Sequence, residues 1–183
     1  MRPVRIGFVG VGNMGQAAHL RNFVMVPNCQ VVAVCDVKPD HAPQVAQKWG
    51  VPHAYTSHHD MLANHELDGI VAIQPFTRHG SIIPELLSYG KPILTEKPIA
   101  ASIAQGERIV AAAQAHHTWV MVGYHKRSDP AVMHAKAEIT RLVASGELGK
   151  MTYIRILMPA GDWIANGFNQ NIPSTDISDT LPH

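Results

Sequence analysis

Three glycines near the N-terminus have the spacing of a phosphate-binding turn. Gly10, Gly12 and Gly15 follow one short apolar run and precede an amphipathic one. Between a strand and a helix, the first such glycine permits a tight turn, the second lets the backbone approach a pyrophosphate, and the third allows close packing of helix on strand. The free N–H groups of the helix start then face the phosphates. Glycine turns are common, so this spacing alone is weak evidence for a cofactor.

An acidic residue at the end of the second apolar run supplies the other half of a dinucleotide fingerprint. Asp36 lies about twenty residues after the glycines, where a carboxylate binds the ribose hydroxyls of the adenosine. We therefore expect a dinucleotide held by Asp36 and by the turn, which includes Asn13 and Met14. A carboxylate repels the extra phosphate of NADP, so NAD is favoured over NADP, although nearby Lys38 weakens this preference. The alternative is a purely structural turn with Asp36 as a helix cap.

Methyltransferases that use S-adenosylmethionine are a second class to weigh. They also place a glycine turn after the first strand and an acidic residue after the second. Their turn usually reads Gly-x-Gly-x-Gly after an acidic residue, whereas Phe8 and Val9 precede the turn here and its third glycine comes later. The dinucleotide interpretation is therefore favoured.

A lysine near the middle of the chain could take part in catalysis. Lys97 follows Glu96 at the end of a predicted strand, the edge where open α/β sheets bind their ligands. There it could donate to a substrate hydroxyl and stabilise the negative charge on the oxygen as hydride leaves the adjacent carbon. The alternative is a solvated Glu–Lys pair in a loop.

These groups need a scaffold of alternating strands and helices. Short β-branched runs alternate with amphipathic stretches up to about residue 124, which predicts an α/β protein with a doubly wound parallel sheet, the Rossmann fold. We expect strands at residues 5–9, 30–35, 53–55, 69–73, 92–95 and 119–122, and helices at 13–25, 41–49, 81–89 and 103–115. Gly50 and Gly90 follow two of these helices, where a left-handed cap places glycine.

The pattern changes after residue 124. Asp129 and Pro130 predict a helix start, Gly146 predicts its end, and residues 151–158 alternate like a strand. A lone helix and strand cannot form a stable domain. We therefore expect a Rossmann domain over residues 1–123, followed over 124–183 by the start of an incomplete α+β domain for substrate binding and oligomerisation.

Composition narrows the location and the partners. The net charge of +1, with scattered basic residues, gives no footprint for nucleic acid or a membrane surface. Cys29 and Cys35 lie in or beside one apolar run and are expected to stay reduced. We find no secretory signal and no apolar stretch of transmembrane length. A cytoplasmic protein with a small-molecule partner is expected.

Twelve histidines raise the question of a metal. The adjacent pairs His58–His59 and His116–His117 are the obvious candidates, but neighbouring side chains do not share a helix face. No HExxH or Cys–His spacing accompanies them. We therefore expect surface histidines and no structural or catalytic metal.

Four segments together resemble the glucose-fructose oxidoreductase, inositol dehydrogenase and rhizopine catabolism (Gfo/Idh/MocA) family. They are the glycine turn with Asp36, the stretch QPFTRH at residues 74–79, the stretch GKPILTEKP at 90–98, and the stretch GYHKRSDP at 123–130. Their order and spacing match over residues 4–158. The set is far more specific than any single motif.

The resemblance implies further site residues. Cofactor contacts outside the glycine turn are implied for Pro75, His79, Glu96, Lys97 and Arg127. Lys97 is also the implied catalytic residue beside the nicotinamide and the substrate. Residues 124–127 would close the site, although His125 replaces an asparagine that is common in the family.

The resemblance also implies the activity and what the second domain should contain. Family members are NAD(P)-dependent oxidoreductases that act on sugars, polyols or related hydroxylated compounds, and we expect this activity and a homo-oligomer. Their second domain carries an Asp and a His, of which the His commonly serves as general acid or base. Nothing after Trp163 offers that pair, so Asp176, Asp179 and His183 are not assigned the role. The alternative is a non-catalytic dinucleotide-binding module.

Overall fold

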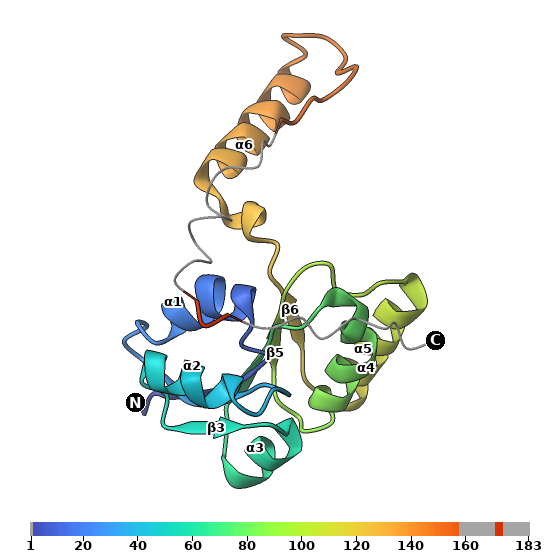
Figure 1. The fold of residues 1–183 in the computed structure, drawn as a ribbon. Helices are drawn as coiled ribbons and strands as arrows, with labels where there is room; N and C mark the ends of the chain where they lie inside the picture. Colours follow the sequence, from blue (N-terminus) through green and yellow to red (C-terminus); the bar gives the residue numbers. More distant parts are fainter. Residues whose placement is uncertain (1, 158–170, 174–183) are drawn as a thin grey trace. The chain divides into compact units, whose positions relative to one another are not determined.

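A computed structural model describes residues 2–157 and 171–173 of the chain (Figure 1). The described residues form two compact units. One runs to Gly123 and includes residues 171–173, and the other begins at Tyr124.

The first unit contains a six-stranded sheet in the order β3-β2-β1-β4-β5-β6, and each neighbouring pair is parallel. The strands are β1 (Val4–Val9), β2 (Cys29–Cys35), β3 (His53–Tyr55), β4 (Gly69–Ala72), β5 (Ile93–Thr95) and β6 (Val120–Val122). The chain winds outward from β1 to β3, returns to the other side of β1 with β4, and continues to β6. This confirms the doubly wound Rossmann architecture. Its switch point, where such sheets bind ligands, lies between β1 and β4.

Helices cover both faces of this sheet (Figure 1). They are η1 (Gly15–Leu20), α1 (Arg21–Phe23), α2 (His41–Trp49), α3 (His58–Asn64), α4 (Phe76–Leu87) and α5 (Ile103–Ala115). Leu20 and Val45 pack in one buried cluster with Phe8 of the sheet. Met61 and Ile83 pack in a second cluster, which covers the opposite face. Truncating one such buried side chain to Ala costs roughly 2–5 kcal/mol, so both clusters hold the sheet edge in place.

Helix boundaries follow local capping chemistry. Gly50 ends α2 in the left-handed conformation, and Gly90 also has a positive φ of 68°. The first helix includes one turn of π-helix, η1, and ends at Phe23 rather than residue 25. Helix α4 begins five residues before the expected 81, directly after Pro75.

Helix α3 was not expected from the sequence. Its seven residues bury only Met61, so it has no extended apolar stripe. Its start is fixed by Ser57, whose side chain accepts a hydrogen bond from the Asp60 N–H.

The second unit contains the short helix η2 (His125–Ser128) and the helix α6 (Pro130–Ser145). Asp129 caps α6 by accepting a hydrogen bond from the Ala131 N–H at 3.0 Å, and Gly146 ends the helix with a φ of 67°. Residues 151–157 are not in a strand, so this expectation is wrong for the residues that are described. A strand requires a hydrogen-bonded neighbour, and the described residues supply none here.

None of the helices within residues 2–157 is long and apolar enough to cross a membrane.

Candidate functional site

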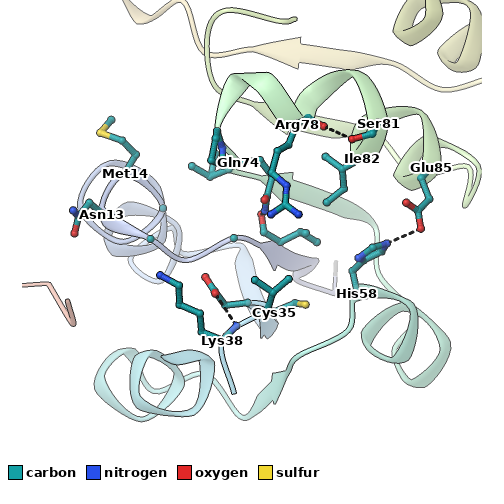
Figure 2. A pocket seen from close by; sticks show the side chains of 18 residues that line it. Asn13, Met14, Cys35, Lys38, His58, Gln74, Arg78, Ser81, Ile82 and Glu85 are labelled. Atoms are coloured by element: carbon teal, nitrogen blue, oxygen red, sulfur yellow. Dashed lines mark hydrogen bonds and ion pairs between the residues drawn. The ribbon is translucent and has the colours of Figure 1, made fainter. Parts of the chain in front are cut away.

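A cavity of about 570 Å³ opens where β1, β2 and β4 end (Figure 2). This volume is within the range of ligand pockets. We call it the cleft. Its lining comes from the glycine turn, the end of β2, the loop after β4, and helices α3 and α4: Val9, Gly10, Gly12, Asn13, Met14, Gly15, Cys35, Asp36, Val37, Lys38, His58, Ile73, Gln74, Pro75, Arg78, Ser81, Ile82 and Glu85.

The three glycines of the turn are needed for different reasons. Gly10 has a φ of 91°, and a Cβ there would collide with the carbonyl oxygen of Ile73. A Cβ on Gly15 would lie 2.7 Å from the carbonyl oxygen of Gly10, so this residue permits close packing of the turn. A Cβ on Gly12 would meet no atom within 4 Å. The packing of the fold therefore does not require a glycine at position 12, which faces the open cleft.

Asp36 holds the turn against the end of β2. Its Oδ2 accepts a hydrogen bond from the Val11 N–H at 3.2 Å, and its Oδ1 accepts one from the Lys38 N–H at 3.2 Å. The Gly10 N–H also donates to the Cys35 carbonyl oxygen at 2.8 Å. Asp36 thus ties the turn to the end of β2 and also lines the cleft. It does not cap α2, whose N-cap position is Asp40.

Cys35 lies at the end of β2, beside Asp36, and it is chemically inert. Burial, together with the negative charges of Asp36 and Asp60, raises the pKa of its thiol to about 12. A thiol needs to lose its proton to act as a nucleophile or a metal ligand. Cys35 therefore belongs to the packing of the sheet edge.

His79 is fully buried and does not appear among the residues that line the cleft. Its Nδ1 lies 3.0 Å from the carbonyl oxygen of Pro98, and its Nε2 lies 3.1 Å from that of Gln74. The ring therefore ties the loop after β4 to the loop after β5. Pro75, in contrast, lines the cleft itself.

Glu96 and Lys97 follow β5 and are also absent from the cleft lining. Glu96 Oε1 lies 2.8 Å from His19 Nε2, and both side chains are largely buried. The Lys97 backbone N–H donates to Glu96 Oε2 at 3.1 Å, and the residue is exposed. His19 belongs to η1, the helix that continues from the glycine turn. No motif in the sequence pointed to His19.

Arg127 lies in the second unit. Its guanidinium carbon is 5.6 Å from the ring centroid of Tyr124, a cation–π contact. Its contact with the cofactor stays a prediction.

Several lining residues were not predicted as contacts. Arg78, Ser81 and Ile82 of α4 point toward the cleft in Figure 2, with His58 and Glu85 at the end away from Asn13. His58 was missed as a lining residue because α3 itself was missed. Arg78 belongs to a stretch that carries the family resemblance, so its position was available from the sequence.

A short segment late in the chain reaches the glycine turn. The Asn171 side chain donates to the carbonyl oxygen of Asn13 at 3.1 Å. The Ile172 N–H donates to Gln16 Oε1 at 3.0 Å, and Gln16 Nε2 donates back to the Ile172 carbonyl oxygen at 3.0 Å. No pattern in the sequence pointed to this contact.

Comparisons with known proteins agree with this geometry. The model of the Gfo/Idh/MocA family, described as an oxidoreductase family with an NAD-binding Rossmann fold, matches residues 4–124. The inositol 2-dehydrogenase of Acidothermus cellulolyticus is 32% identical over 149 residues, which are 81% of this chain and 42% of that protein. The scyllo-inositol 2-dehydrogenase (NAD(+)) of Bacillus subtilis is 31% identical over 155 residues, which are 83% of this chain and 43% of that protein.

A solved structure is similar over the same region. The scyllo-inositol dehydrogenase of Lactobacillus casei, with bound NAD(H) and scyllo-inositol, has a TM-score of 0.70 at 25% identity. The match covers 82% of this chain and 44% of that one. The chain therefore spans less than half the length of these similar proteins.

Proposed function

Because the chain belongs to the Gfo/Idh/MocA oxidoreductase family, with its NAD-binding Rossmann fold, we propose that it binds a nicotinamide dinucleotide in the cleft. The observation that carries this proposal is the open space at Gly12 beside a turn that Gly10 and Gly15 make possible. The pyrophosphate would lie against Gly12 and Asn13, at the positive end of the first helix. Asp36 would accept hydrogen bonds from the ribose hydroxyls.

The cofactor is proposed to be NAD rather than NADP. The Asp36 carboxylate lies at the cleft wall, where a 2′-phosphate would have to approach it. Like charges that come close to one another repel. Lys38 also lines the cleft and opposes this preference in part.

The reaction is proposed to move a hydride between nicotinamide C4 and a carbon of a polyol or sugar. The inositol dehydrogenases that resemble this chain suggest the substrate class. Lys97 would hold the reacting hydroxyl and stabilise negative charge on its oxygen, and a group outside residues 1–123 would accept the proton. Glu96 would orient the loop that carries Lys97, since it binds the Lys97 N–H. His79 would act through the same loops without touching the cofactor.

The domain arrangement, assembly and location belong to the same proposal. Residues 1–123 would form the cofactor domain, and residues 124–183 would begin a domain for substrate binding and oligomerisation, with Arg127 near the junction. The free thiols of Cys29 and Cys35 support a reducing compartment, the cytoplasm.

A non-catalytic dinucleotide-binding module is the second candidate. All residues that line the cleft come from the first unit, so binding does not require the rest of the chain. This candidate and the enzyme share the cofactor and differ only in turnover.

Calorimetry with NADH, followed by an absorbance assay with NAD and scyllo- or myo-inositol, tests the proposal. We expect NADH binding by the 183-residue chain and turnover far below that of a full-length relative. Loss of a positioned proton-transfer group typically lowers a rate by about 10²–10⁴-fold. Absence of NADH binding would refute the proposal, whereas binding with no detectable turnover would favour the module.

A further inference from the structure

Two adjacent histidines meet one carboxylate at the α3–α4 contact. His58 Nε2 lies 2.9 Å from Glu85 Oε1, and His59 Nε2 lies 2.7 Å from the same oxygen. Figure 2 shows His58 and Glu85 facing one another at one end of the cleft. The centroids of the two rings lie 4.3 Å apart, with the ring planes tilted by 33°. Neighbouring residues were expected to point apart, yet at this helix start both rings reach the same partner.

The three side chains are of the types that bind zinc in proteins. Their ligand atoms all lie within 4.8 Å of one another, and no other group of three or more His, Cys, Asp or Glu side chains in residues 2–157 and 171–173 meets this condition. Zinc binds histidine nitrogen and carboxylate oxygen at about 2.0–2.2 Å in a tetrahedral site, which places neighbouring ligand atoms roughly 3.5 Å apart. Small movements of the side chains would therefore lengthen the contacts of 2.9 and 2.7 Å between the histidine nitrogens and Glu85 to that spacing.

Two helices fix the positions of these ligands. Ser57 caps α3 and so sets the place of His58 and His59 in its first turn. Glu85 lies near the end of α4, and Tyr89 follows that helix. The ligands thus come from separate elements that already pack together, and a metal would join them without a large rearrangement.

Tyr89 supplies the outer contact that metal-bound histidines usually have. Its hydroxyl lies 2.8 Å from His59 Nδ1. When Nε2 binds a metal, Nδ1 carries the proton and donates it to an acceptor, and a tyrosine oxygen can accept. When Nε2 instead donates to Glu85, the Tyr89 hydroxyl donates to Nδ1. Tyr89 therefore fits both states.

We propose that His58, His59 and Glu85 bind one Zn²⁺ ion, with Tyr89 orienting His59 and water completing the coordination. Imidazole nitrogens select zinc and similar transition metals over Mg²⁺ and Ca²⁺, which take oxygen ligands. His59 and Glu85 are exposed, so the ion can reach the site from solvent. Three protein ligands leave one position open.

Titration of the untagged, EDTA-treated and dialysed 183-residue chain with ZnCl₂ in a calorimeter tests the site. We expect one saturable site. His59→Ala and Glu85→Gln should each weaken Zn²⁺ binding at least about tenfold, because each removes a ligand, and Tyr89→Phe should weaken it by roughly tenfold through the outer contact. MgCl₂ should give no saturable binding.

A matched control comes from a second pair of neighbouring histidine rings. His53 lies 4.4 Å from the ring of His65, and His53→Ala should bind Zn²⁺ as the wild type does. Circular dichroism and thermal melting of each variant in EDTA show whether it is folded. Zn²⁺ should raise the melting temperature of the wild type and of His53→Ala but not that of His59→Ala.

Three results would overturn the proposal. They are no saturable Zn²⁺ binding by the folded wild type, equal affinity in the wild type and both ligand variants, or an equal loss in His53→Ala. None of these measurements involves NADH, so they stand apart from the proposed oxidoreductase function.

Discussion

His19 and Glu96 join the two chemically important segments of the first unit. The contact of 2.8 Å between His19 Nε2 and Glu96 Oε1 links the helix after the glycine turn to the loop that carries Lys97. Both side chains are largely buried, at 13% and 16% exposure, so solvent screens their interaction little. Movement of one segment is therefore coupled to the other.

The His19–Glu96 contact should appear in a double-mutant cycle. His19→Ala and Glu96→Ala should each lower the free energy of unfolding by about 1–3 kcal/mol, since each leaves a polar partner unsatisfied. The double variant should lose less than the sum, with a coupling energy of roughly 0.5–3 kcal/mol. Urea unfolding of the four proteins measures it. Strict additivity would show that the contact does not form in solution.

Gly10 and Gly12 should give opposite results when changed. Gly12→Val should keep the melting temperature, because a Cβ there meets no atom within 4 Å, but it should abolish NADH binding by filling the place of the pyrophosphate. Gly10→Ala should destabilise the fold by more than about 1 kcal/mol, because its φ of 91° and the Ile73 carbonyl exclude a side chain. Calorimetry and thermal melting separate the two. Normal NADH binding by Gly12→Val would contradict the proposed pyrophosphate position.

Asp36 should control cofactor choice. The wild type should bind NADH roughly tenfold or more tightly than NADPH, since like-charge contacts in an interface cost several kcal/mol. Asp36→Asn should reduce the difference in affinity between NADH and NADPH. Its amide oxygen can still accept one backbone hydrogen bond in the turn. Asp36→Ala should narrow the gap too, but it should also lower stability by removing the bonds from Val11 and Lys38. Equal affinities for the two cofactors in the wild type would refute this role.

Acid should weaken the fold partly through Asp68. The hydrogen bond from Arg2, followed by that from the Arg5 backbone, lowers the pKa of Asp68 to about 2 from an ordinary 3.8. Because folding lowers this pKa, the carboxylate contributes fully above about pH 4 and loses its contribution as pH falls through about 2. The difference in unfolding free energy between wild type and Asp68→Asn should shrink over that range.

Arg2→Gln provides the matching control. Arg2 makes two hydrogen bonds of 2.7 Å with the Asp68 carboxylate. The difference in unfolding free energy between the wild type and Arg2→Gln should therefore also shrink as the pH falls. A constant difference between pH 2 and 4 would show that the pair does not set the pKa of Asp68. Both side chains are partly exposed, so added salt should reduce the effect.

The apolar end of the second unit should promote self-association. Ile154, Ile156 and Leu157 are each more than half exposed. Exposed apolar stretches of this kind favour association. Light scattering should show oligomers whose population rises with concentration, and the double variant Ile154→Lys, Ile156→Lys should reduce them. Ile103→Lys, on exposed α5, should not. A wild type that stays monomeric at high concentration would contradict this prediction.

Local patterns predicted most of the first unit from the sequence. The glycine turn and Asp36 lie within one strand–helix–strand segment, so spacing alone related them. His19 differs, because its partner Glu96 lies 77 residues further along the chain and meets it only in the folded unit. The family resemblance implies a cofactor contact for His79, whose buried ring lies against the carbonyl oxygens of Pro98 and Gln74. That cofactor contact stays a prediction.

The expected strand at residues 151–158 shows a second limit. Alternating apolar residues describe the two faces that a strand would have, but a strand forms only with a neighbour. Residues 151–157 have no such neighbour among the described residues, and residue 158 lies outside them. Periodicity therefore predicts which face of a strand would be apolar, but it does not predict whether the segment pairs with another strand.

Gln16 gives the contact with residues 171–173 an unusual selectivity. Its buried amide exchanges two hydrogen bonds with the backbone of Ile172, as one residue of a strand does with its partner, and its second N–H donates to the Val11 carbonyl at 2.9 Å. The side chain thus imitates a peptide group in its contact with the main chain of this segment. The Ile172 side chain also packs against the buried cluster that contains Leu20 and Val45. Position 172 therefore needs both an N–H for Gln16 and an apolar side chain for the cluster, which proline at position 173 could not offer one residue later.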